Sequence, residues 1–111
     1  MRTIDEPCTR TLTGGIDLVE QDGGPVLLLR GEVDSLVVAA WQAEARSEPR
    51  AAVAVDLSAT TFLDCRGLRM LLRETDETRR SGRLPELRRP SRMVRRMMEL
   101  SGAAPLFATV P

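Results

Sequence analysis

The stretch from position 51 to 68 constrains the fold most, because a buried strand there is followed within a few residues by a helix. Residues 51–57 are almost entirely apolar, and such a run predicts a strand that is covered on both faces. Asp64 stands at the start of the next helix, whose leucines at positions 68, 71 and 72 form one apolar stripe. This strand and this helix together predict an α/β domain.

The residues before this stretch predict a hairpin and a crossover. Residues 16–19 and 25–30 are two strand-like runs, and the paired glycines between them suit a hairpin turn. A helix is expected over residues 36–46, with Asp34 or Ser35 as its cap. A strand, a helix and another strand at this spacing predict a parallel crossover pair.

The C-terminal third predicts two helices and two weaker strands. One helix is expected over residues 64–80, and another from a cap at Ser91 to a stop at Gly102. Residues 83–89 between them should be a strand by topology. Because a proline within that run cannot donate to a ladder, we expect a shortened or bulged edge strand. Residues 106–110 are expected to form a last short strand or an ordered tail.

The length of 111 residues suits one domain with a single hydrophobic core. We expect residues 1–14 to be a flexible lead-in and residues 15–111 to form the domain. No apolar run approaches the roughly 20 residues that span a bilayer, so direct membrane insertion is not expected. The first residues place acids and a proline where a secretory signal has its apolar region, so a cytoplasmic location is expected.

The residue inventory argues against several kinds of chemistry. The chain has no histidine, which removes the usual general base and the usual zinc ligand. We therefore expect no catalytic residues, no metal site and no cofactor, and the chain is not expected to be an enzyme. Cys8 and Cys65 lie far apart in sequence and are expected to be free thiols.

Charge is distributed unevenly along the chain. Residues 1–64 hold 5 arginines against 11 acidic residues, a net charge of −6, whereas residues 65–111 hold 11 against 5, a net charge of +6. Such an asymmetry can steer a protein partner. Nucleic-acid binding is not expected, because the overall charge is zero and the arginines lack interleaved aromatic residues.

Several separate blocks, agreeing in order and spacing over roughly residues 16–107, resemble the STAS domain family. The blocks are Gly31-Glu32-Val33-Asp34, Asp56-Leu57-Ser58, Phe62-Leu63-Asp64-Cys65-Arg66-Gly67-Leu68, and the run from Pro90-Ser91 to Leu100-Ser101-Gly102. The resemblance implies a STAS-like single α/β domain, with a mixed sheet of four to five strands flanked by helices. The bacterial single-domain members of this family are anti-sigma factor antagonists.

The resemblance implies a partner switch in transcription regulation. The antagonist binds an anti-sigma factor that is also a GHKL-type serine kinase, and phosphorylation of a serine at the helix start ends the binding. In this chain, Asp64 matches the family's Asp, Gly67 its glycine, and Asp34 the acid of the early block. Cys65 stands where the phosphoacceptor serine would be, and Arg66 where the family often has a small or hydroxyl residue.

A partner-binding surface is therefore expected in a loop over residues 60–68 and at the start of the following helix. Its residues are Asp34, Thr60, Thr61, Asp64, Cys65, Arg66, Gly67 and Leu68. Because a kinase that modifies hydroxyls does not modify a thiol, we expect binding that phosphorylation at position 65 does not switch. Asp34 is equally interpreted as a simple helix cap.

Other interpretations stay open at this point. Cys65 can fill a small, partly buried slot, or sense redox state, since a helix start and Arg66 favour a thiolate while Asp64 opposes it. The hydroxyls at positions 58, 60 and 61 can satisfy turn backbone groups or accept phosphate.

Met97 and Met98 are expected in the core, and the arginines at 92, 95 and 96 form a second candidate surface. The alternative function is a structural subunit or scaffold of a transporter ATPase or of a stress-signalling complex, and pairing of the chain with itself is left open.

Overall fold

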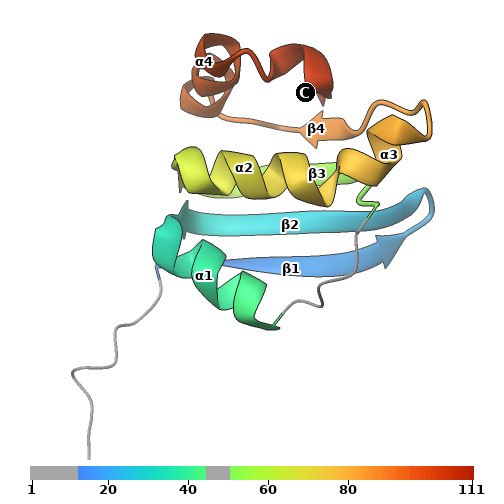
Figure 1. The fold of residues 1–111 in the computed structure, drawn as a ribbon. Helices are drawn as coiled ribbons and strands as arrows, with labels where there is room; N and C mark the ends of the chain where they lie inside the picture. The colour runs from blue at the N-terminus through green and yellow to red at the C-terminus, as the bar shows by residue number, and fades with distance from the viewer. Residues whose placement is uncertain (1–12, 45–50) are drawn as a thin grey trace, which may run out of the picture.

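The computed structural model describes residues 13–44 and 51–111 of the chain. In this part, five strands form one mixed sheet in the order β1-β2-β3-β4-β5, and helices cover it (Figure 1). The predicted fold class, a single α/β domain with four to five strands, is confirmed. Most of the expected lead-in over residues 1–14 lies outside the described residues, although Gly14 already belongs to the first strand.

The predicted hairpin is present, and both of its strands are longer than expected. β1 (Gly14–Gln21) pairs antiparallel with β2 (Gly24–Val33), from Gly14 opposite Gly31 to Gln21 opposite Gly24. Gly31 has a φ of +66° inside β2, and a Cβ there would collide with the backbone of Thr13. This glycine therefore lets β2 continue to Val33. The sequence pattern had predicted that the strand ends at Arg30.

The crossover predicted from strand to helix to strand is also present. α1 (Ser35–Glu44) connects β2 to β3 (Ala54–Leu63), and β2 and β3 run parallel from Val26 opposite Ala54 to Val33 opposite Leu63. The last two residues expected in this helix lie outside the described residues.

The prediction of a loop over residues 60–68 was wrong, because the first four of these residues are the end of β3. β2 continues far enough to offer backbone partners to Thr60, Phe62 and Leu63. Two irregularities in the register, each adding one residue to β3 relative to β2, accommodate the polar stretch within the strand. The strand therefore leads straight into the next helix without a loop.

The single helix expected over residues 64–80 is two helices, α2 (Cys65–Glu74) and α3 (Asp76–Arg80). They meet at Thr75, which is fully buried and whose hydroxyl donates to the carbonyl of Leu71 at 2.7 Å. Such back-bonding by a threonine competes with the helical ladder and bends or ends a helix.

The C-terminal elements are β4 (Glu86–Arg88), α4 (Arg92–Ser101), the short 3-10 helix η1 (Ala104–Leu106) and β5 (Ala108–Val110). The cap at Ser91 and the left-handed stop at Gly102 are as predicted. β4 is short, as expected, but it is an inner strand between β3 and β5. The prediction of an edge position was wrong, because Pro85 lies just before β4 and not within it. The carbonyl of Pro85 accepts from the N–H of Ala108 at 2.8 Å.

One hydrophobic core lies between the sheet and its helices. α1, α2 and α3 cover one face of the sheet (Figure 1), and Val94 and Met98 of α4 join the same buried cluster. The core position predicted for Met98 is confirmed, and Met97 packs against the cluster while partly buried. Among the described residues, no helix is long and apolar enough to cross a membrane.

Polar side chains tie distant strands together across the sheet. The guanidinium of Arg88 donates to Glu86 Oε1 at 2.8 Å and to Gln21 Oε1 at 3.0 Å. Because Gln21 ends β1 and Arg88 ends β4, the second bond crosses both β2 and β3.

Burial raises the pKa of the neighbouring Asp56, but hydrogen bonds from Ser58 and the charges of Arg89 and Arg88 bring the pKa below its ordinary value.

Candidate functional site

Two parallel strands of the sheet end side by side, and each is followed at once by an aspartate and a helix. Val33, the last residue of β2, pairs with Leu63, the last residue of β3. Asp34 and Asp64 follow, and α1 and α2 begin one residue later. The carboxyl edge of parallel strands is where ligand sites of α/β sheets usually form.

Both aspartates cap the helices that follow them. Asp34 Oδ1 accepts from the N–H groups of Leu36 and Val37, at 3.1 and 3.0 Å. Asp64 Oδ1 accepts from the N–H of Gly67 at 2.9 Å, and the Asp64 N–H donates to the carbonyl of Val33 at 3.3 Å. Each carboxylate thus satisfies backbone donors that a helix start leaves without a partner.

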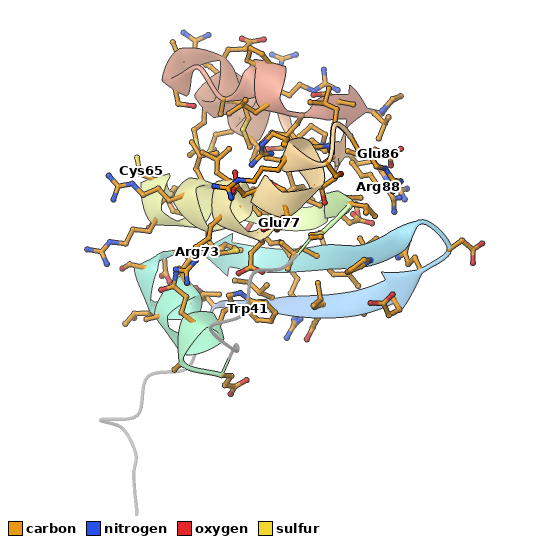
Figure 2. The ribbon with its side chains drawn as sticks, turned by 45° about the vertical axis from the view of Figure 1, so that its right-hand side comes forward. Trp41, Cys65, Arg73, Glu77, Glu86 and Arg88 are labelled. Atoms are coloured by element: carbon orange, nitrogen blue, oxygen red, sulfur yellow. The ribbon has the colours of Figure 1, made fainter. Side chains whose placement is uncertain are left out.

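Cys65 is the first residue of α2, and its side chain is exposed. In Figure 2 it lies at the start of α2, on the opposite side of the molecule from Glu86 and Arg88. The interpretation that this cysteine fills a partly buried slot was therefore wrong. Its thiol faces solvent next to the exposed Arg66, where a partner can touch it.

Three of the eight expected surface residues are buried. Thr60 is 7% exposed and its hydroxyl donates to the carbonyl of Leu29 at 3.0 Å. Leu68 belongs to the core cluster. Gly67 lies so close to the strand ends that a Cβ would collide with the side chain of Leu63. These three residues shape the surface, whereas the exposed Thr61, Cys65 and Arg66 and the half-buried Asp34 and Asp64 form it.

Sequence reasoning missed two residues of this region. Ser35 is exposed and has the place on α1 that Cys65 has on α2, directly after a capping aspartate. Phe62 is 40% exposed at the end of β3, one residue before the strand finishes. The repeated order of a strand, an aspartate and a small polar side chain is present in the sequence, but it indicates a shared surface only once the two strands are known to end side by side. We call the surface formed by Asp34, Ser35, Thr61, Asp64, Cys65 and Arg66 the docking edge, after the role proposed for it below.

Comparison with known proteins identifies the family. A family model described as "Mlab, STAS domain" matches residues 16–107. The chain belongs to the STAS domain family. Among solved structures, this STAS domain is similar to the Bacillus cell fate determinant SpoIIAA in its phosphorylated form. The TM-score is 0.57 and the identity 19%, over 86% of this chain and 91% of that one. No curated protein matches the chain.

The predicted family is therefore confirmed, and the solved structure supports the same fold for the STAS domain. Within the part of the chain that the structure describes, no group of three or more histidine, cysteine, aspartate or glutamate side chains could hold a metal ion.

Replacing Gly67 by alanine is expected to destabilise the STAS domain by about 1–2 kcal/mol, because overpacking against Leu63 outweighs the gain in helix propensity. Urea denaturation measures the free energy of unfolding. The matched control is Gly23→Ala in the exposed hairpin turn, where a Cβ meets only the flexible end of Arg83 at 3.4 Å. A Gly67→Ala variant as stable as this control would show that packing does not require the glycine.

Proposed function

We propose that this STAS domain is a regulatory protein-binding module resembling an anti-sigma factor antagonist. It binds an anti-sigma factor of the GHKL-type serine kinase class, or a related regulatory protein, in the bacterial cytoplasm. The docking edge makes the contact, and catalysis is not part of the function. Membership of the STAS family and the similarity to SpoIIAA support this proposal.

The observation that carries the proposal is the exposed Cys65 at the first position of α2. The preceding aspartate uses its carboxylate to cap the helix, so at the start of α2 the thiol and Arg66 are the side chains that remain for recognition. A phosphoserine at this place would carry about −1.5 to −2 charges, next to a carboxylate that is already there. A kinase that modifies hydroxyls adds no phosphate to a thiol, and we propose that binding at this edge is not switched by phosphorylation of residue 65.

The electrostatics of the docking edge also favour binding over catalysis. Both of its carboxylates are engaged in helix caps, and the chain contains no histidine that could act as a general base. The remaining groups, a thiol, an arginine and two hydroxyls, are suited to contact with a protein surface.

A second candidate function is a structural subunit or scaffold of a transporter ATPase or of a stress-signalling assembly. Membership of the STAS family supports it, because some STAS domains resemble components of such assemblies. Affinity purification of the tagged full chain from the source cell separates the two functions. A GHKL-type kinase among the recovered proteins supports the first, and a transporter ATPase or further STAS domains support the second.

A carboxylate at position 65 is expected to weaken binding of the purified partner at least about tenfold, because like charges across an interface are costly. Isothermal titration calorimetry compares Cys65→Asp with the wild-type chain. The matched control is Met93→Asp, which adds the same charge to an exposed position in the first turn of α4 and should bind like the wild type. Equal affinities of wild type and Cys65→Asp would refute a docking role for this edge.

The kinase test addresses the switch itself. After incubation with the cognate kinase and ATP, the wild-type chain is expected to gain no phosphate between residues 60 and 68. The Cys65→Ser variant, which regains a hydroxyl at the exposed helix start, is expected to gain one. Phosphopeptide mass spectrometry reads the result. A single phosphate on wild-type protein within this segment would contradict the proposal.

A further inference from the structure

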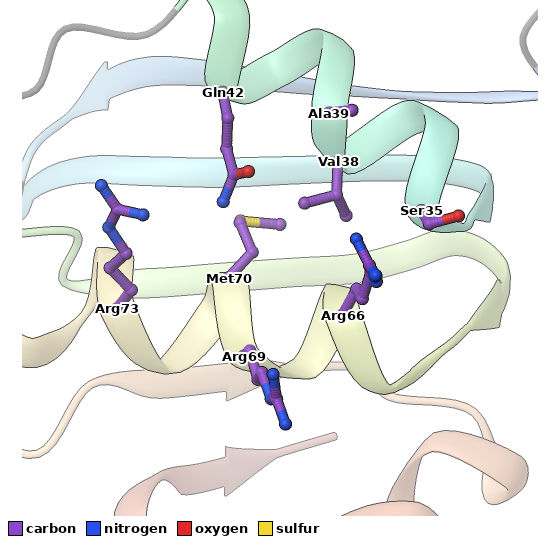
Figure 3. Close-up of a pocket in the computed structure, with 8 residues that line it drawn as sticks. All are labelled: Ser35, Val38, Ala39, Gln42, Arg66, Arg69, Met70 and Arg73. Atoms are coloured by element: carbon purple, nitrogen blue, oxygen red, sulfur yellow. The ribbon is translucent and has the colours of Figure 1, made fainter.

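A groove of about 440 Å³ runs between α1 and α2, next to the docking edge. Three arginines of α2 line it, Arg66, Arg69 and Arg73, and Ser35 lies at the α1 end. Figure 3 shows Arg66 and Arg73 extending toward α1 on either side of Met70, which faces Val38 across the gap. We call this feature the arginine groove.

Among the described residues, those that line the arginine groove carry positive charge and no negative charge. Ion pairs among the described residues join Arg30 to Asp17, Arg80 to Asp76 and Arg88 to Glu86, and none of these three includes a groove arginine. All three groove arginines are exposed, and Arg66 and Arg73 extend toward α1, whereas Arg69 extends away from it (Figure 3).

The stability of α2 favours Arg73, a cation in its last turn, but does not explain why three arginines are placed together. Arg66 occupies the first turn of α2, which holds no acidic residue, and a cation is unfavourable at that end of a helix dipole. Arg69 lies three residues after Arg66 and four before Arg73, and like charges at these spacings repel one another. An anionic ligand in the groove would remove this repulsion.

The length and the floor of the groove indicate the kind of anion. Arg66 and Arg73 are seven residues apart, about 10 Å along the helix axis. In the polyproline II conformation, which has three residues per turn, carboxylates three residues apart point to the same side and are separated by about 9 Å. Between the two arginines the groove presents the apolar side chains of Val38 and Met70. A protein segment with acidic side chains on both sides of an apolar one matches this pattern.

We propose that the arginine groove binds an acidic segment of a protein partner, with carboxylates paired to Arg66 and Arg73 and an apolar side chain over Met70. The inference rests on the proposed function in one respect, the identity of the partner as the protein held at the docking edge. Arg66 and Ser35 belong to both surfaces, so a partner docked at the edge can continue along the groove.

The test is an NMR titration of the full ¹⁵N-labelled chain with the peptide acetyl-Glu-Ala-Leu-Glu-Ala-Leu-Glu-amide. Backbone amide shifts are expected to change in α1 and α2, with a Kd of about 1 mM or tighter that weakens as salt is raised. The peptide with glutamine in place of every glutamate is expected to cause no such change.

Charge reversal at the three groove arginines, Arg66→Glu with Arg69→Glu and Arg73→Glu, is expected to weaken peptide binding at least about tenfold. The matched control reverses three exposed arginines of α4, Arg92→Glu with Arg95→Glu and Arg96→Glu, which changes the net charge equally and should leave binding within about threefold of wild type. If the groove variant does not fold, the same three positions are changed to glutamine and the same loss is expected.

Four results would overturn the inference: no shifts at about 10 mM peptide, equal shifts with the glutamine peptide, shifts that map to α4, or equally large shifts with sodium phosphate. The last result would show a site for small anions. Because this titration uses no partner, its failure leaves the Cys65→Asp test of the docking edge untouched. Failure of that test would in turn leave peptide binding by the groove intact.

Discussion

The parallel pairing of β2 with β3 is the constraint on which the rest of the structure depends. Its register sets Val33 opposite Leu63, so both strands end at the same edge of the sheet. The helices that follow must then start side by side, and an aspartate caps each of them. The docking edge and the groove between α1 and α2 are both consequences of this one pairing.

The same geometry divides the residues of the edge into two groups. Asp34 and Asp64 accept hydrogen bonds from backbone N–H groups, and Gly67 allows α2 to approach the strands closely. The hydroxyl of Thr60 donates to the carbonyl of Leu29 within the sheet. Side chains that project outward from this frame are free to vary without loss of the fold. A cysteine can therefore stand at position 65 in a STAS domain, because no core contact depends on the residue there.

Local chemistry predicted much of the fold. The glycines of the hairpin turn, the cap at Ser91 and the stop at Gly102 act within a few residues, so the sequence is enough to find them. Long-range pairing decided the features that were missed. In isolation, the sequence around Thr60 and Thr61 is typical of a turn. Because β2 continues alongside and pairs with this segment, it becomes part of β3. Thr75 breaks the predicted long helix through a bond made at a buried position.

The candidate site was predictable in part for the same reason. Asp64 and Cys65 stand out in the sequence, whereas Ser35 becomes relevant only once the register places α1 beside α2. The spacing of the groove arginines can be read from the sequence, but their meaning depends on the neighbouring α1, whose groove-lining residues include no acid.

Amide hydrogen exchange of the full chain, alone and bound to its purified partner, tests most directly whether the shared edge of β2 and β3 is the docking surface. The account predicts slower exchange on binding at residues 34–38 and 64–68, where the two helices begin. Exchange that is unchanged in both segments while protection appears along α4 would contradict it.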